Sequence, residues 1–174
     1  ILGVQAAAEM VEIGTTFGLL NPQAAKVARG LIATRFSRYW VGRDALLSRP
    51  TRDLIVHALT VGASPADLKK QLAVRVGIAK SRASRIIRTE LAVAQNTGMN
   101  DLITTAAEQA DVQMVKIWRA TKDKRTRDSH RALDGVTVDS DKPFKRGLMH
   151  PHDPAASASE TVNCRCVAIY RRKR

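Results

Sequence analysis

The stretch Trp118-Arg-Ala-Thr-Lys-Asp-Lys-Arg-Thr-Arg-Asp-Ser-His130 opens the region of this chain that decides its fold. Two later segments belong with it, Met149-His-Pro-His-Asp-Pro154 and Glu160-Thr-Val-Asn-Cys-Arg-Cys166. Together they hold three of the four histidines, both cysteines and a dense set of arginines. Such residues, interrupted by glycine and proline, are typical of a small irregular lobe and not of a hydrophobic core.

Upstream of this lobe, apolar residues recur at intervals of three and four, which predicts amphipathic helices. Asn21-Pro22 and Ser64-Pro65 each combine a capping side chain with proline at the first helical position. The expected helices cover about residues 2–20, 22–39, 51–61, 65–76 and 80–108. Arg88 and Glu90 lie too close in sequence to pair on a helix surface. They are either solvated or brace the lobe against the helix.

Within the lobe, the spacing of apolar residues changes to that of strands. Val115, Ile117 and Trp118 predict a first strand, and Asp134-Gly135 predicts a turn into a second. Residues 166–170 predict a last strand that pairs back on the first. We therefore expect an α+β fold, with a mainly helical region over residues 1–110 and a loop-rich lobe over residues 111–174. That lobe contains a small antiparallel sheet and ends in a basic tail.

The formal net charge of the chain is +13, and the residues after Asp111 are the denser in positive charge. A field of that size attracts polyanions, so nucleic acid or an acidic protein surface is the expected partner. The alternative is a solvated basic surface without a ligand. No apolar run reaches the roughly 18 residues of a membrane helix, so we expect no membrane partner. The chain starts at Ile1 inside a helical pattern, so we expect a processed product or a fragment.

The basic residues of the lobe lack the interleaved aromatic residues that stack on single-stranded bases. If double-stranded DNA is the partner, contact should be with phosphates, independent of base sequence and steeply dependent on salt. The expected contact residues are Lys122, Lys124, Arg125, Arg127, Arg171, Arg172, Lys173 and Arg174.

Several short motifs occur along the chain in a familiar order. They are Arg88-Thr-Glu90, Asn96-Thr-Gly98, Trp118-x-Ala-Thr-x-Asp123, Arg127-x-x-His130, Leu133-Asp-Gly135, Phe144, Pro151-x-Asp153-Pro and Asn163-Cys-Arg-Cys166. Over about residues 50–170 this order resembles the phage Mu F-like minor head protein family of phage head morphogenesis. The resemblance implies a structural virion component of a tailed bacteriophage that acts in capsid assembly or in genome packaging or ejection.

The resemblance also implies partners and a location. The expected partners are the phage portal protein, the major capsid protein or both, together with double-stranded DNA bound without sequence preference. The expected location is the interior of the phage head, after assembly in the host cytoplasm. No catalytic residue is implied, and we expect the protein not to be an enzyme.

Some members of that family carry Cys-Pro-x-Cys where this chain has Arg127 to His130, and His-Pro before the Asn-Cys-Arg-Cys ending. Such a set looks like zinc ligation. Here His130 stands at the second cysteine position, Arg127 replaces the first, and Val162 precedes Asn163. The candidate zinc ligands are therefore His130, His150 or His152, Cys164 and Cys166, and no other cofactor is expected. The protein would then be a zinc-stapled basic module that binds nucleic acid. The alternative is that His130 and Asp123 join a hydrogen-bond network, with one cysteine buried and inert.

An enzyme is the third hypothesis. His130 and Cys164 have the chemistry of a base and a nucleophile, and Arg88 with Glu90 resembles a transferase signature. An ADP-ribosyl transferase or a nuclease would fit those residues. The chain contains no glycine-rich phosphate loop, no H-E-x-x-H and no G-x-S-x-G. The clustered polar residues are explained equally well as a scaffold for loops, so an architectural role is preferred.

Overall fold

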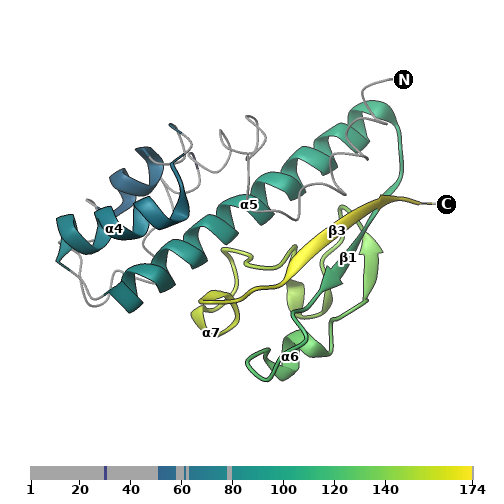
Figure 1. Ribbon diagram of the computed structural model, residues 1–174. Coiled ribbons are helices and arrows are strands. Elements are labelled where there is room, and N and C mark those ends of the chain that lie inside the picture. The colour runs from purple at the N-terminus through teal and green to yellow at the C-terminus, as the bar shows by residue number, and fades with distance from the viewer. Residues whose placement is uncertain (1–29, 31–50, 58–60, 62, 78–79, 174) are drawn as a thin grey trace.

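The computed structural model describes residues 30, 51–57, 61, 63–77 and 80–173 of the chain. A long helix, α5 (Lys80–Ala110), crosses the molecule, with α4 (Pro65–Val76) on one side and a small sheet on the other (Figure 1). The helices expected over residues 2–20 and 22–39 lie outside the described residues. Among the described residues, no helix is long and apolar enough to cross a membrane.

Helix α4 begins and ends at the residues that the sequence predicts. Ser64 is its N-cap, and the Ser64 side chain accepts a hydrogen bond from the Asp67 N–H at 3.1 Å. Pro65 occupies the first turn, where its missing N–H leaves no hydrogen bond unmade. Gly77 ends the helix with a φ of 65°, a left-handed conformation that glycine adopts without steric penalty.

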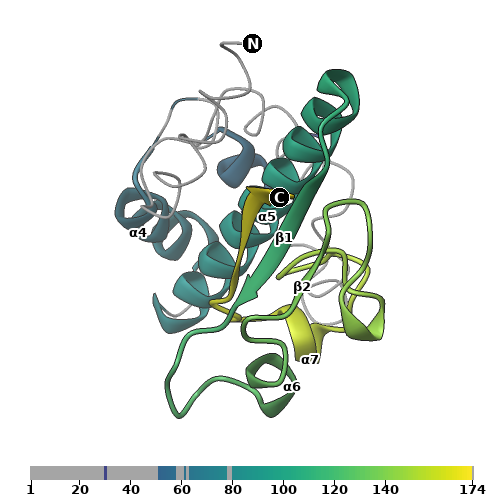
Figure 2. The ribbon, with the colours of Figure 1, turned by 90° about the vertical axis from the view of Figure 1, so that its right-hand side faces the viewer.

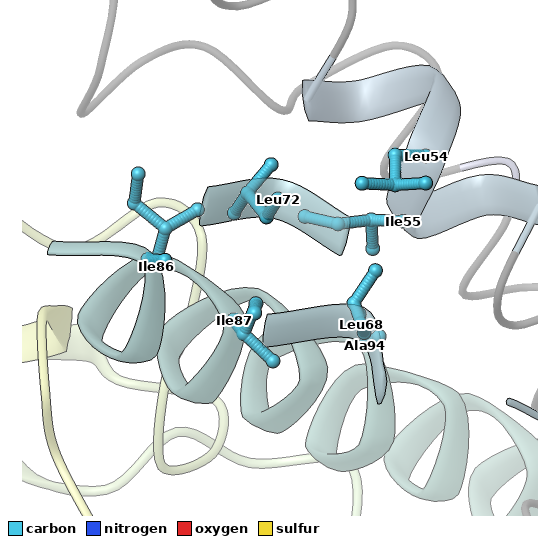
Figure 3. Packing of buried hydrophobic residues seen from close by; sticks show 8 residues of the cluster. Leu54, Ile55, Leu68, Leu72, Ile86, Ile87 and Ala94 are labelled. Carbon is cyan, nitrogen blue, oxygen red and sulfur yellow. The ribbon is translucent and has the colours of Figure 1, made fainter. Parts of the chain in front are cut away.

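The helices share one apolar core, which lies on the N-terminal half of α5 (Figure 3). Its buried members are Leu54, Ile55, Leu68, Leu72, Ala83, Ile86, Ile87 and Ala94. They come from helical residues 51–57, from α4 and from α5. Because Ala83 and Ala94 are fully buried and small, the neighbouring helices can approach α5 closely.

The sheet has three antiparallel strands in the order β2-β1-β3. They are β1 (Met114–Arg119), β2 (Thr137–Asp139) and β3 (Val167–Arg172). Ile117 of β1 lies opposite Ile169 of β3, which confirms that the last strand pairs back on the first. Strand β3 extends two residues beyond its last apolar residue, Tyr170. Arg171 and Arg172 therefore belong to β3 and not to a free tail.

A second apolar cluster lies between the sheet and the loops of the lobe. Its buried members are Trp118, Leu133, Phe144, Leu148, Cys164 and Cys166. The Trp118 ring meets the rings of Phe144 and His130 edge to face, each with centroids 5.3 Å apart. The short helices α6 (Asp128–Arg131), η1 (Lys145–Gly147) and α7 (Ala158–Thr161) carry the loops over this cluster. The lobe therefore has a core of its own around Trp118.

Candidate functional site

Three of the five candidate metal ligands converge in the interior of the lobe. His130 on α6 places Nδ1 3.4 Å from the Sγ atoms of both Cys164 and Cys166. The three donor atoms lie within 4.8 Å of one another, and all three residues are buried. Both cysteines are free thiols. Two sulfurs and one imidazole nitrogen therefore point at a common position.

The orientation of His130 is set by Glu160. His130 Nε2 lies 2.8 Å from Glu160 Oε2, which leaves Nδ1 directed at the sulfurs. Ser129 donates to the same carboxylate oxygen at 3.0 Å, and Arg146 donates to the other at 3.1 Å. Although burial opposes it, hydrogen bonds from Ser129 and His130 lower the pKa of Glu160. A carboxylate behind a histidine is the arrangement that orients imidazole ligands in metal sites.

The two thiols differ in acidity. The Cys164 side chain hydrogen-bonds to Cys166 and is the largest influence that lowers the pKa of Cys166, to about 5, while burial opposes the shift. The side chains of His130 and Trp118 lower it further. The Cys166 N–H in turn donates to Cys164 Sγ at 3.3 Å. The direction of this shift favours the thiolate form of Cys166, which is the form that ligates metals.

This donor set fits zinc, which prefers thiolate and imidazole ligands. The Trp118 indole N–H is buried and makes no hydrogen bond of standard length to any described residue, although it lies close enough to Cys166 to lower the pKa of that thiol. A charged metal–thiolate group is a suitable neighbour for such a donor. Arg127 donates to the Val162 carbonyl oxygen at 2.7 Å. Three ligands leave one coordination position open.

The other two candidate histidines lie apart from this cluster. His152 Nδ1 lies 3.2 Å from Asn96 Nδ2, and His152 Nε2 lies 2.9 Å from the Cys164 carbonyl oxygen. Burial lowers the pKa of His152 to about 4. His150 Nδ1 lies 2.9 Å from the Pro151 carbonyl oxygen, and burial lowers its pKa as well. Both act as neutral, buried supports of the loop around Asp153.

Asp123 is not part of the His130 network. Its carboxylate pairs with both terminal nitrogens of Arg165, one of them at 2.8 Å. This pair holds the pKa of Asp123 well below its ordinary value, although burial acts in the opposite direction. Thr121 also donates to the Arg165 carbonyl oxygen at 3.1 Å. The loop after β1 is therefore tied directly to the cysteine segment.

The lobe is also fastened to helix α5. Arg88 donates to Asn163 Oδ1 at 2.8 Å, and the Asn163 N–H donates to Thr89 Oγ1 at 2.9 Å. Arg88 thus braces the lobe, which is one of the two roles that the sequence allows. Glu90 is buried on the same helix.

The candidate DNA-contact residues form two groups at opposite ends of the sheet. Lys122, Lys124 and Arg125 are exposed in the loop after β1, whereas Arg171 and Arg172 are exposed at the end of β3. Because β3 runs antiparallel to β1, the length of β1 separates the groups, about 17 Å for six residues. Figure 1 shows β3 running away from α6 and ending at the right-hand side of the molecule.

Some basic residues of these groups already have partners. Lys173 pairs with Asp139 at 2.7 Å, and Lys122 lies 3.6 Å from Asp134. Arg127 is half-buried against Val162, so it acts mainly inside the lobe. Arg174 lies outside the described residues. The fully available positive charges are therefore fewer than the sequence indicates.

Sequence reasoning did not single out two residues, Glu160 of the site and Lys116 of the neighbouring strand β1. Glu160 gives no spacing signal, because its partner His130 lies 30 residues away. Lys116 is fully buried and donates to the Ser140 carbonyl oxygen at 2.9 Å and to Asn100 Oδ1 at 3.3 Å. The sequence does contain a signal for the burial of Lys116. Residues two apart share one face of a strand, so Lys116 lies on the same face of β1 as Trp118.

Comparison with known proteins places these features in a family context. A family model described as "Phage Mu protein F like protein" matches residues 50–169. The NAD(+)-arginine ADP-ribosyltransferase EFV of Enterococcus faecalis is 32% identical over 158 residues, which are 87% of this chain and 30% of that protein. The minor head protein GP7 of Bacillus phage SPP1 is 32% identical over 121 residues, 67% of this chain and 38% of GP7.

A third relative is the uncharacterized protein YqbB of Bacillus subtilis, which is 28% identical over 122 residues. Those residues are 66% of this chain and 39% of YqbB. The matched part of this chain thus spans between 30% and 39% of the length of these three relatives. No solved structure matches the chain.

Proposed function

Because this chain belongs to the phage Mu protein F-like family, we propose that it acts as a minor head protein in the assembly of a tailed bacteriophage head. The observation that carries this proposal is the family match over residues 50–169, which includes α4, α5 and nearly all of the lobe. The similarity to the minor head protein GP7 of a Bacillus phage supports the same role. We place the protein in the interior of the virion, after assembly in the host cytoplasm.

The proposed partners are the portal protein, the major capsid protein or both. A rigid lobe fastened to a long helix through Arg88 and Thr89 suits a protein that joins neighbours without changing shape. The net charge of +13 opposes self-association and favours an acidic neighbour.

Contact with packaged DNA is the finer part of the proposal. The exposed Lys124 and Arg125 at one end of the sheet and Arg171 and Arg172 at the other offer positive charge to phosphates. Phosphate contacts contribute affinity without base specificity, which suits a protein that must tolerate any genome sequence.

The second candidate function is a zinc-stapled module that binds nucleic acid, and the convergence of His130, Cys164 and Cys166 favours it. A zinc ion held by these residues would cross-link α6 to the segment before β3. Such a cross-link stabilises a lobe whose apolar core is small. This role and the head role are compatible, because the ion would support the fold on which either depends.

We do not propose catalysis. The ADP-ribosyltransferase among the relatives shares only 30% of its length with this chain, and the minor head protein GP7 shares much of the same region. His130 is oriented by Glu160 toward two thiols in the interior, which is the arrangement of a binding site more than of an exposed nucleophile. The residues of the lobe are therefore assigned architectural roles.

The test is to assemble heads from the phage's own portal and capsid proteins with and without this chain. Heads are then purified, and the chain is quantified by mass spectrometry before and after nuclease treatment. We expect the chain to co-purify with heads, and to be lost when the portal protein is omitted if the portal is its partner. A chain that stays in the soluble fraction in every combination would contradict the head role.

A further inference from the structure

A groove of about 680 Å³ lies between the two helices and the lobe. Residues of α4, of the N-terminal two-thirds of α5, of the cysteine segment and of β3 line it. Its floor is apolar, since Ile87, Leu91 and Met99 of α5 face it. Figure 2 shows β3 on the side of the sheet that faces α4, with β2 on the far side.

Among the described residues, no strand pairs with the edge of β3 that borders this groove. In β1, the Trp118 N–H donates to the Val136 carbonyl oxygen, and the Trp118 carbonyl oxygen accepts from the Gly135 N–H. The backbone hydrogen bonds of Trp118 therefore point to the β2 side of β1. The backbone N–H and C=O groups of successive strand residues point to opposite neighbouring strands, so those of Ile117 form their hydrogen bonds with β3. Ile169, which lies opposite Ile117, therefore directs its backbone N–H and C=O groups to β1.

The same alternation fixes the direction of the neighbouring backbone groups of β3. The N–H and C=O groups of Ala168 and Tyr170 must point away from the sheet. Among the residues that the structure describes, these four groups have no hydrogen-bond partner. Both residues line the groove. An unpaired row of this kind is a template for one more strand.

The walls of the groove are positively charged. Lys69, Arg88, Arg125 and Arg165 line it, whereas no described aspartate or glutamate does. Arg165 is neutralised by Asp123, and Arg88 donates to the uncharged Asn163. Lys69 and Arg125 are exposed and form no salt bridge with any described residue. The groove thus combines an apolar floor, a free strand edge and uncompensated positive charge at its mouth.

We propose that this groove binds an extended segment of a partner protein in which apolar and acidic side chains alternate. The segment adds as a strand to the free edge of β3, so that its backbone pairs with Ala168 and Tyr170. Alternate side chains of an extended strand point to opposite faces. Apolar side chains then pack on α5, while carboxylates reach Lys69 and Arg125. Strand addition of this kind obtains affinity from the backbone and specificity from alternate side chains.

The inference does not rest on the head role or on DNA contact. Arg125 is shared with the proposed DNA-contact residues, but Lys69 and the backbone of Ala168 and Tyr170 are not among them. The probe is a blocked peptide of about eight residues, the length of an ordinary strand, that alternates valine and glutamate. Two matched peptides serve as controls. One has lysine in place of glutamate, and the other has N-methyl groups along one edge.

Hydrogen exchange of the full chain is followed residue by residue by NMR. We expect the valine–glutamate peptide to slow exchange of the Ala168 and Tyr170 amides by about tenfold or more, a change of ~1.4 kcal/mol in opening free energy. The lysine peptide and the N-methylated peptide should not slow it. Lys69→Glu should weaken binding by about tenfold, whereas Lys70→Glu, its exposed neighbour outside the groove, should leave binding unchanged.

Three results would overturn the proposal. The first is that the valine–glutamate peptide fails to bind, or binds without slowing these two amides. The second is that both amides already exchange slowly in dilute protein without peptide, since the edge would then be covered by the chain itself. The third is protection that rises with protein concentration alone, which would make a second copy of the chain the occupant.

Discussion

Arg88 of α5 donates a hydrogen bond to Asn163 of the cysteine segment at 2.8 Å, across 75 residues of sequence. Asn163 has a φ of 59°, a left-handed conformation that asparagine tolerates better than most residues. The next residue along the chain is the candidate ligand Cys164. This contact therefore fixes the cysteine segment with respect to the helix.

We expect the Arg88–Asn163 contact to be measurable in a double-mutant cycle. Arg88→Ala and Asn163→Gly each remove it, and glycine keeps the left-handed backbone without strain. The coupling free energy of unfolding should be about 0.5–1 kcal/mol, since the bond is exposed to solvent. Urea unfolding of the four proteins provides the values, and a coupling indistinguishable from zero would show that the two residues act independently.

The buried hydroxyl of Thr89 should matter more than the Arg88 contact. Thr89→Val keeps the shape of the side chain but leaves the Asn163 N–H without its acceptor. We expect the free energy of unfolding to fall by about 1–1.5 kcal/mol, the upper part of the range for one hydrogen bond, because the bond is partly buried and Thr89 itself is fully buried. Thr104→Val on the same helix is the control, because the Thr104 hydroxyl donates to the Asn100 carbonyl within the helix and to no other described residue. Equal losses in both variants would refute the special role of Thr89.

Purified protein should contain about one zinc ion per chain, because the ligands are pre-positioned. Cys166→Ser and His130→Ala should abolish binding, and Glu160→Gln should weaken it by roughly 10- to 100-fold by releasing His130. His57→Gln is the control, since His57 is exposed on the helical residues 51–57. The zinc content of each purified protein is measured by inductively coupled plasma mass spectrometry. A zinc content that survives Cys166→Ser rules out this site.

DNA binding should depend steeply on salt and should involve both ends of the sheet. Replacing Lys124 and Arg125 by alanine should lower the slope of log affinity against log salt by about 0.9 for each phosphate that the variant no longer neutralises. Alanine at Lys70 and Arg75 of α4 removes the same charge elsewhere and serves as the control. Fluorescence titration at several salt concentrations measures the slope. Equal effects of the two double variants would mean that only net charge matters.

Stability should rise with pH above neutrality because of Lys116. Burial lowers the pKa of Lys116 from 10.5 to about 8, so between these values the unfolded chain binds more protons than the folded chain. The free energy of unfolding should therefore increase, by at most about 1.4 kcal/mol per pH unit. Urea unfolding between about pH 8 and about pH 9.5 tests this. The range ends below ~10, the ordinary pKa of tyrosine, because burial raises the pKa of Tyr170 in the folded protein and its titration would add a second pH effect.

Lys116→Met is the matched comparison for that pH series. Methionine fills a similar volume and does not titrate, so the excess rise in stability of the original protein over the variant isolates Lys116. Identical pH profiles in the two proteins would show that Lys116 keeps an ordinary pKa.

The amino-acid sequence by itself determined the features that depend on neighbours along the chain. Ser64-Pro65 and Gly77 set the ends of α4, because caps act through residues only a few positions away. Alternating apolar residues around Ile117 and Ile169 identified the strands that pair. These local signals were sufficient for the α+β class. The length of β3 escaped them, because Arg171 and Arg172 are held there by pairing with β1 and not by burial.

The tertiary structure alone decided which distant side chains meet. Sequence offered His130, Cys164 and Cys166 as metal ligands together with either His150 or His152, and only folding brings His130 within reach of both cysteines. His150 and His152 have the same chemistry, yet hydrogen bonds to neighbouring carbonyl groups turn them elsewhere. The free edge of β3 was equally hidden, because strand order is set by long-range pairing. Contacts between residues far apart in sequence depend on packing of the whole chain, and no local periodicity encodes them.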